Sequence, residues 1–311
     1  YAFIDGSMGA SFSVTPWLRK LVDDINLFYV AGYYKLDKMQ TVSASLRYFS
    51  LGEINYTTSE GNALPYTGKP NEFALDVAYS RLLSEKFSGA ITMRYIRSDL
   101  SQGAMNESGE ETKAGNSFAA DIAFYFRHQT AIDRKKANIM AGLLISNIGS
   151  KMSYNDQYKE YLPANMKLGG GIDYEIDRYN KVAFTLELNK LLVPTPQENQ
   201  TAEEYRDQSV PASIFKSFND APDGFAEELK EINISAGVEY IYNNAFALRA
   251  GYFHEHETKG NRKLASAGAG LKFNMLTIDA SYIIPVESNN PLANTVRLTL
   301  AFDMSKISKK K

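Results

Sequence analysis

The chain has 311 residues, no cysteine, and 34 basic against 36 acidic residues. The absence of cysteine excludes disulfide bonds, thiolate metal sites and a cysteine nucleophile. The near-neutral charge argues against a nucleic-acid-binding protein that relies on bulk charge. No apolar run is long enough to form a transmembrane helix. The 20 tyrosines and 21 glycines, with a single tryptophan, instead favour strands and tight turns.

Alternation of apolar and polar residues predicts strands along most of the chain. In the segment 71–81, for example, Phe73, Leu75, Val77 and Tyr79 alternate with small or polar residues. Most such segments have about ten residues, which is the length that a tilted strand needs to cross a bilayer. We predict fourteen strands, at residues 7–14, 25–35, 39–49, 71–82, 87–98, 117–127, 137–147, 165–176, 181–192, 232–242, 245–254, 264–273, 275–285 and 294–303.

The connections between these segments alternate in length. Short ones are predicted at 36–38, 84–86, 177–180, 243–244 and 274, with 128–136 the longest of this set. The intervening ones are mostly longer, at 15–24, 50–70, 99–116, 148–164, 193–231, 255–263 and 286–293. This rhythm is typical of a barrel with short turns at one end and long loops at the other. We therefore predict an all-β fold: a single transmembrane antiparallel up-and-down β-barrel domain of about 14 strands over residues 1–311.

The two faces of the strands favour a barrel in lipid. One face carries large apolar side chains, and the other carries Gly, Ser, Ala and Thr together with charged residues. Fourteen strands enclose a lumen too wide for an apolar core, so the polar face is predicted to point inward. The inward charges are expected to be Arg47, Asp76, Arg94, Asp121, Arg127, Glu187, Glu239, Arg249, Lys272, Asp279 and Arg297. The alternative is a soluble all-β binding protein, which would fold without detergent.

Three histidines are the candidates for catalysis or metal binding. His254 and His256 would share a strand face as a loose metal pair, but no third ligand is apparent. His128 is expected to be a solvated residue in a short turn. An outer-membrane enzyme acting on lipid would need a serine–histidine pair at membrane level, and the spacing reveals none. We therefore expect no enzyme activity, no metal and no cofactor.

Residues 193–231 interrupt the strand pattern and are predicted to form a long extracellular loop with short helices. Pro211 can open one helical turn, and Asp223 can cap a second short helix. A loop of this size either folds over the barrel mouth or docks a partner. It carries three phenylalanines, Phe215, Phe218 and Phe225.

Five runs of residues point to one family. They are 162–171 (LPANMKLGGG), 190–196 (KLLVPTP), 214–231 (IFKSFNDAPDGFAEELKE), 251–263 (GYFHEHETKGNRK) and 290–297 (NPLANTVR). These runs resemble the PorV/PorQ family, which comprises outer-membrane proteins of the Bacteroidota type IX secretion system. Within this family they are more similar to the PorV branch. The resemblance spans essentially the whole chain, and the runs 214–231 and 251–263 are the specific ones. The family is in turn similar to the FadL fatty-acid transporters, which are barrels plugged by an N-terminal segment.

The resemblance implies an accessory role in the outer membrane of a Gram-negative bacterium rather than catalysis. PorV-like proteins are implicated in exporting cargo with a C-terminal β-domain, and they associate with the translocon barrel and the surface sortase complex. A family member would hold the cargo domain with its extracellular loops and pass it from the translocon to the surface attachment complex. The expected partners also include outer-membrane lipid but no nucleic acid. From their loop positions, the contact candidates are Trp17, Tyr66, Phe215, Phe218 and Phe225.

Two further expectations concern the lumen. The N-terminal plug of the family is expected to be missing, because the chain starts almost at the first predicted strand. The alternative function is a FadL-like transporter of hydrophobic small molecules across the outer membrane, which needs an apolar lumenal pocket and a lateral opening. The inward residues are mostly small and charged, which counts against this alternative.

Overall fold

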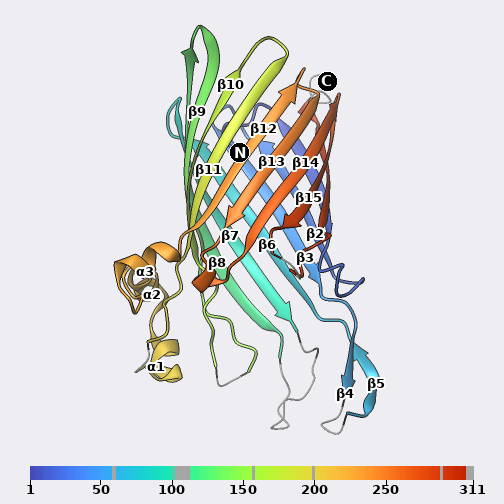
Figure 1. Cartoon of the computed structure of the whole chain (residues 1–311), viewed down its shortest axis with the longest axis vertical. Coiled ribbons are helices and arrows are strands. Elements are labelled where there is room, and N and C mark those ends of the chain that lie inside the picture. The colour runs from blue at the N-terminus through green and yellow to red at the C-terminus, as the bar shows by residue number, and fades with distance from the viewer. Residues whose placement is uncertain are drawn as a thin grey trace.

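The computed structural model describes residues 1–57, 61–100, 102, 113–155, 158–197, 200–287 and 290–305, and the side chains of all of these except 63–66. Fourteen antiparallel strands form one closed barrel, because β1 pairs with both β2 and β16 (Figure 1). Strands that are consecutive in the barrel wall are consecutive in sequence, except that β4 and β5 leave it as a separate hairpin between β3 and β6. The predicted fourteen-stranded up-and-down barrel is therefore confirmed.

The strands follow the predicted segments closely. Their bounds are β1 Met8–Pro16, β2 Asn26–Lys35, β3 Gln40–Ser50, β4 Ile54–Thr57, β5 Ala63–Gly68, β6 Asn71–Leu82, β7 Phe87–Asp99, β8 Gly115–Ile132, β9 Lys135–Gly149, β10 Asn165–Glu175, β11 Asn180–Leu191, β12 Asn233–Tyr242, β13 Phe246–His254, β14 Lys263–Phe273, β15 Leu276–Pro285 and β16 Val296–Asp303. The helices are α1 Ala202–Asp207, α2 Val210–Lys216, α3 Phe225–Lys230 and the 3-10 helix η1 Glu257–Lys259.

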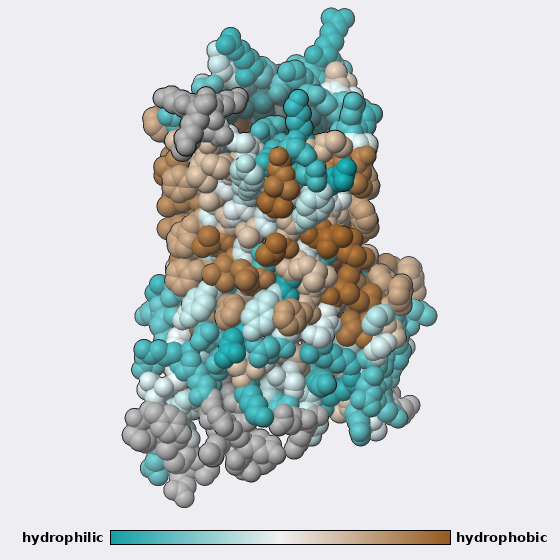
Figure 2. Space-filling view, turned by 180° about the vertical axis from the view of Figure 1, so that it is seen from behind, coloured by the Kyte–Doolittle hydropathy of each residue, from teal (hydrophilic) through white to brown (hydrophobic). Residues whose placement is uncertain are grey.

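Apolar side chains cover the outside of the barrel. Val77, Met93 and Phe184 are each more than half exposed, although each belongs to a barrel strand. Figure 2 shows apolar residues gathered in a band across the middle of one face of the molecule, with mainly hydrophilic residues above and below it. An apolar exterior of this kind fits lipid and not water, so the distribution supports the membrane barrel over the soluble alternative.

The interior carries charged side chains that pair across neighbouring strands. Arg94 on β7 donates to Asp76 on β6 at 2.7 Å and to Asp121 on β8 at 2.9 Å, and it also donates to Asn147 on β9. The register between β8 and β9 shifts at this level, and the N–H of Asn147 donates to Asp121 at 2.8 Å. This group, which we call the Arg94 node, links four strands and confirms the predicted interior position of its charged residues.

Two more groups of oppositely charged side chains pair with each other inside the barrel. On the other side of the barrel, Arg249 on β13 pairs with Glu239 on the adjoining strand β12 and reaches past β14 to pair with Asp279 on β15. Lys167 on β10 pairs with Glu187 on β11 at 2.9 Å. Because every second residue faces the lumen, these pairs hold neighbouring strands in register on the inner face.

The first residues of the chain lie inside the barrel. The ring of Tyr1 stacks on Tyr33 of β2 at 5.5 Å, and the ring of Phe3 meets Tyr125 of β8 edge-on at 5.8 Å. The strands β3, β6 and β7 separate β2 from β8 in the wall, so this segment reaches across part of the lumen. The expectation that the family's plug is missing stays a prediction.

Short turns connect the strands at the end where the two termini lie. Asp133 and Arg134 alone separate β8 from β9, and both have positive φ, as two-residue hairpin turns require. The predicted connection 128–136 is therefore wrong, because the two strands continue to this turn. His128 consequently lies on β8, close to the ring of Phe126, and not in a turn.

The predicted loop 50–70 also contains more structure than expected. Its two halves pair as the antiparallel hairpin β4–β5, which projects from the long-loop end of the barrel (Figure 1). Leu51 and Pro70 are joined by a backbone hydrogen bond at the base of this excursion, which closes the gap between β3 and β6. The hairpin thus extends outward without interrupting the barrel wall.

Candidate partner-binding face

The largest of the long connections forms three short helices beside the barrel. We call residues 192–232, which include α1, α2 and α3, the knob. In Figure 1 these helices lie outside the outline of the barrel, next to its wall and toward the long-loop end. The knob does not cover the barrel opening, so of the two predicted arrangements the structure does not have the one that folds over the mouth.

Local sequence signals explain where the knob helices begin. Thr201 and Glu204 form a capping box for α1, in which each side chain accepts the backbone N–H of the other. Pro211 lies in the first turn of α2, as predicted. The predicted cap of α3 is wrong, because its N-cap is Gly224 with a φ of 74° and not Asp223. Glycine adopts this left-handed backbone without the steric cost that an aspartate has there.

The knob exposes apolar rings that a soluble surface would hide. Phe215 is 78% exposed, Phe225 is 73% exposed and Phe218 is 43% exposed. Leu229 of α3 is also more than half exposed. Exposed apolar side chains that gather on one small element mark an interaction site, and aromatic residues are enriched among those that dominate binding energy.

A cluster of charged residues fixes the knob to the barrel. Lys190, at the end of β11, donates to Glu228 at 2.8 Å and to Glu231 at 2.6 Å. Lys259, in the connection after β13, donates to Glu227 at 2.6 Å and to Glu231 at 3.0 Å. The side chains of Lys190 and Glu228 are less than a tenth exposed. Helix α3 is therefore held from two sides by ion pairs, of which those to Lys190 are buried.

The carboxylate of Asp220 sits beside this cluster with one oxygen unsatisfied. Its Oδ2 accepts the N–H of Thr195 at 2.8 Å, whereas its buried Oδ1 has no partner among the described residues. Glu228 accepts the N–H of Asp220 at 2.7 Å, which brings two carboxylates close together. Burial raises the pKa of Asp220, the hydrogen bond from Thr195 opposes this, and Glu228 and Glu231 raise it further.

We expect Asp220→Asn to stabilise the docked knob modestly at neutral pH. A carboxyl whose folded-state pKa is raised contributes stability below its unfolded pKa, and that contribution is lost as the pH rises through the folded-state value. Hydrogen exchange of the amides of 210–231, measured from acidic to neutral pH, should show slower exchange in the variant at neutral pH. The difference should shrink on acidification, and equal exchange at neutral pH would contradict this reading.

The knob is also tied to the loop 150–164 at the barrel mouth. The hydroxyl of Tyr161 donates to the backbone oxygens of Tyr205 and Gln208 at about 3 Å. Arg206 of α1 pairs with Glu160 at 2.7 Å. The two long loops therefore form one continuous surface at this side of the mouth.

The two remaining contact candidates have different positions. Trp17 is half-buried, meets the ring of Phe49 edge-on at 6.4 Å, and lines a cavity inside the barrel mouth. Tyr66 lies on β5, and its side chain is outside the described part of the structure. The knob phenylalanines and Trp17 are thus separate features, which the loop-position argument had grouped together.

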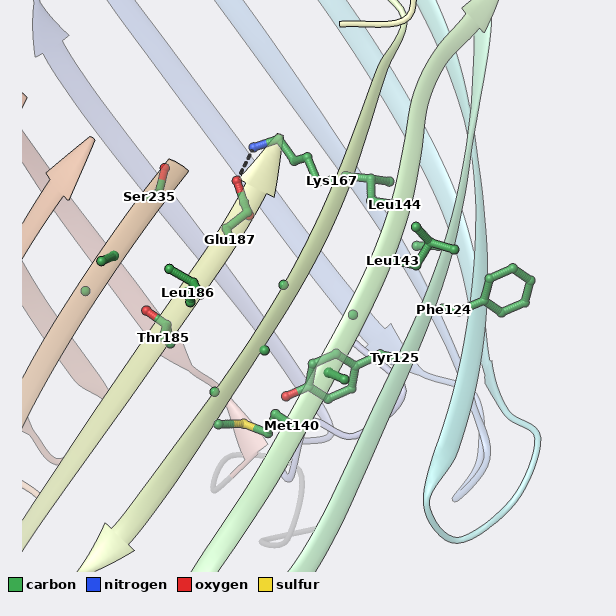
Figure 3. A pocket seen from close by; sticks show the side chains of 18 residues that line it. Phe124, Tyr125, Met140, Leu143, Leu144, Lys167, Thr185, Leu186, Glu187 and Ser235 are labelled. Carbon is green, nitrogen blue, oxygen red and sulfur yellow. Dashed lines mark hydrogen bonds and ion pairs between the residues drawn. The ribbon is translucent and has the colours of Figure 1, made fainter. Parts of the chain in front are cut away.

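A second cavity, of about 600 Å³, lies at mid-barrel against β8 to β12 (Figure 3). Its wall is partly bare backbone, because four inward positions are Gly142, Gly169, Gly171 and Gly237. Tyr125 and Met140 lie toward one end, and the Lys167–Glu187 pair lies toward the other (Figure 3). The charged residues that line the cavity, Lys167 and Glu187, pair with each other. The cavity therefore has few polar groups left with which to recognise a ligand.

His254 and His256, which the sequence offered as a loose metal pair without a third ligand, lie on different elements. The strand β13 ends at His254, and His256 instead begins η1, where its Nδ1 accepts the N–H of Thr258 at 3.2 Å. Glu255, between them, is buried and pairs with Arg262 at 2.6 Å. Within the described ranges, no group of three histidine, aspartate or glutamate residues is placed to hold a metal.

Sequence reasoning did not identify Lys190 and Lys259 as anchors of the knob. They lie 38 and 32 residues from their partners Glu228 and Glu227, so no local spacing connects them. The one available signal is the acidic run at 227–231, which needs cations if it is buried. That signal predicts a basic partner without saying which lysine supplies it.

The family model described as Type IX secretion system protein PorV matches residues 1–198. The chain belongs to this family. Membership, together with the barrel fold, places this PorV-family protein in the outer membrane of a Gram-negative bacterium as part of type IX secretion. No curated protein matches the sequence. Among the helices that the structure describes, none is long and apolar enough to cross a membrane.

Solved structures resemble the PorV-family barrel in fold. The toluene transporter TodX of Pseudomonas putida is 11% identical, with 97% of this chain and 90% of TodX covered and a TM-score of 0.51. The toluene transporter TbuX of Ralstonia pickettii is 9% identical over 97% of this chain and 90% of its own, with a TM-score of 0.50. A Pseudomonas aeruginosa FadL homologue is 9% identical over 97% and 91%, with a TM-score of 0.44. The likeness to TodX and TbuX confirms the FadL-like barrel fold.

Proposed function

We propose that this PorV-family protein binds the C-terminal β-domains of secreted cargo with its extracellular loops. It then passes them from the translocon barrel to the surface attachment complex that contains the sortase. The role involves binding and handover and no chemistry of its own. The main support is the exposure of Phe215 and Phe225 on a knob whose base is fixed by buried ion pairs. A rigid element with exposed aromatic rings suits protein recognition, because little side-chain or loop entropy is lost on binding.

The long-loop end carries the remaining support. Outer-membrane barrels direct their longer loops to the outside of the cell, so the knob and the hairpin β4–β5 face the medium into which cargo emerges. Phe215, Phe218 and Phe225 are the proposed contacts on the knob, and Tyr66 and Trp17 remain candidates on the other loops. Trp17 would contribute only to a partner that enters the barrel mouth, because its ring lines the cavity there.

The double substitution Phe215→Ala and Phe225→Ala tests this proposal. Truncating two central aromatic contacts costs more than about 1 kcal/mol each, so recovery of a purified cargo C-terminal domain in a pull-down should fall at least about tenfold. Phe273→Ala is the matched control, because Phe273 is 81% exposed but lies at the short-turn end. Deletion of 211–229 should abolish recovery. Unchanged recovery with both variants would overturn the role of the knob.

Transport of hydrophobic small molecules has less support. The lumen is crossed by paired charges, including the Arg94 node and the group around Arg249. Such groups bind water and favour polar contents over an apolar conduit. Cargo binding is therefore the function that the combination of family and surface supports best.

A further inference from the structure

The hairpin β8–β9 rises above most of the barrel rim at the short-turn end (Figure 1). Strand β7 begins at Phe87, which lies opposite Phe126 of β8. Strand β8 then continues for six more residues, 127–132, which pair with β9 on one side. On the other side, the N–H of Arg127 donates to the backbone oxygen of Lys86 at 2.8 Å, and no described strand pairs with β8 beyond this point. The hairpin therefore presents a free strand edge above the turn between β6 and β7.

The free edge offers backbone hydrogen-bonding groups to another strand. In an antiparallel sheet, successive residues direct their N–H and C=O groups alternately toward the two neighbouring strands. Because the N–H of Arg127 points to the β7 side, the backbone groups of Gln129 and Ala131 point to that side as well, beyond the end of β7. Natural proteins protect free edges with proline or charged side chains. The stretch 128–132, which reads HQTAI, contains no proline, lysine, arginine, aspartate or glutamate, so the edge is open to pairing.

The side chains along β8 place the free edge in water. Phe124 and Phe126 lie on the outward face of the strand, where Phe124 stacks on Phe87 at 5.8 Å. The next two outward positions are His128 and Thr130, so polar residues follow the apolar ones just where the free edge begins. Unpaired backbone groups are not tolerated in the hydrocarbon of a bilayer, which agrees with this position. Because the long loops of such barrels face the outside of the cell, the free edge lies on the periplasmic side of the outer membrane.

The tip of the hairpin is basic. Residues 133–136 read Asp-Arg-Lys-Lys, so three basic residues stand against one acid and the net charge is +2. All four residues are exposed. The other short turns carry one acid and one base each, at 36–39, 83–86 and 176–179, or no charge, at 243–245 and 274–275. Excess positive charge at this end is therefore concentrated beside the free edge.

The acidic residues at this end of the neighbouring hairpin β10–β11 have cations of their own. Glu175 pairs with Lys181 at 3.0 Å. Asp173 interacts electrostatically with Arg127, and Asp177 shares its turn with an arginine. These acids therefore leave the net positive charge of the β8–β9 tip in place.

We propose that the free edge of β8 pairs with an extended acidic segment of a periplasmic protein. An added strand would bond to the backbone of Gln129 and Ala131, which provides affinity, and its side chains would provide selectivity. The basic tip favours a segment with acidic residues, because opposite charges on adjacent strands are stabilising. The run 306–311 of this chain contains four lysines, so its charge disfavours the chain's own tail, or that of a second copy, as the occupant.

The proposed interface is independent of the knob. The free edge lies at the short-turn end of the barrel, whereas the knob lies toward the long-loop end (Figure 1). The closed barrel wall separates the two surfaces, so one partner can bind on each side of the membrane. The proposal therefore does not rest on cargo binding.

A fluorescein-labelled synthetic peptide in which valine alternates with glutamate tests the proposal, because it is acidic and its valines favour strands. Full-length protein in lipid nanodiscs would be titrated into the peptide, and we expect a saturable rise in fluorescence anisotropy. Gln129→Pro removes an N–H from the free edge and no donor to β9, a position where strands tolerate proline. This variant should weaken the apparent affinity at least about tenfold. Gln129→Ala is the matched control, which keeps the N–H and should bind as the wild type does.

The charge of the partner is tested separately. Lys136→Gln should weaken binding of the acidic peptide about threefold, whereas Lys38→Gln, at the exposed turn between β2 and β3, should not. The same peptide with lysine in place of glutamate should bind at least about tenfold more weakly. Lack of saturable binding to the wild type, or equal binding by Gln129→Pro and Gln129→Ala, would refute pairing at the edge. Equal binding of the two peptides would refute the preference for an acidic segment. Recovery of cargo by the knob should be the same in all these variants.

Discussion

Replacing Arg94 by methionine should lower the free energy of unfolding of the barrel by about 3–5 kcal/mol. The substitution removes the shared cation of the Arg94 node and leaves Asp76 and Asp121 facing each other in a confined part of the lumen, with side chains less than a fifth exposed. Denaturant unfolding in micelles, followed by the fluorescence of Trp17, measures the change. Gel electrophoresis of heated samples would report the same loss of stability, because the variant's band should change its mobility at a lower temperature.

Comparison with Arg249→Met tests whether burial of the ion pairs determines how much stability is lost. Arg249 bridges two carboxylates as Arg94 does, but its side chain is 42% exposed to the lumen and that of Arg94 is 13% exposed. Exposed ion pairs contribute about 1 kcal/mol or less, so this variant should lose clearly less stability than Arg94→Met. Equal losses in the two variants would show that burial of the Arg94 node is not what makes it important.

Replacing Lys190 by methionine should release the knob while the barrel stays folded. Without this lysine, Glu228 and Glu231 lose their buried cation, and among the described residues Lys259 is the cation that still pairs with α3 and Glu231. Breaking a buried pair by removing one partner costs about 3–5 kcal/mol, which exceeds what a short loop element can supply by itself. Hydrogen exchange should show fast exchange at 210–231 and unchanged protection in the barrel strands. Cargo recovery should fall as well, because the proposed contacts would lose their fixed position.

Lys216→Met is the control for that experiment. Lys216 is an exposed lysine on α2 whose recorded contact is a 3.4 Å hydrogen bond to Gln208. Its loss should leave exchange in the knob unchanged. If Lys190→Met behaves like Lys216→Met, the ion pairs do not anchor the knob.

The barrel was predictable because its physical requirement repeats along the chain. Every wall strand needs apolar residues outside and small or polar residues inside, so segments such as 71–82 carry the pattern without reference to any other segment. The missed hairpin β4–β5 lacks this requirement, because it stands outside the barrel wall. The misplaced turn at 133–134 arises because the hairpin β8–β9 continues to pair beyond the apolar segments.

The site was predictable only in part, because its geometry depends on contacts between distant residues. Their position on a long loop pointed to the three knob phenylalanines as exposed, and the structure has them exposed. Nothing in the local sequence reveals that Trp17 turns toward Phe49 or that Lys190 reaches α3. Likewise, the spacing of His254 and His256 allows a metal pair, but it does not reveal that β13 ends at His254 and that His256 is the N-cap of η1.

The knob stands beside the barrel wall and not above its opening (Figure 1). A partner that touches both the knob and the outer strands must therefore lie alongside this protein in the same membrane. Molecules confined to one membrane meet by diffusion in two dimensions, where anchoring raises their effective concentration. Encounters at this surface would then scale with the number of copies per area of membrane, and a weak contact would suffice for frequent exchange between neighbours.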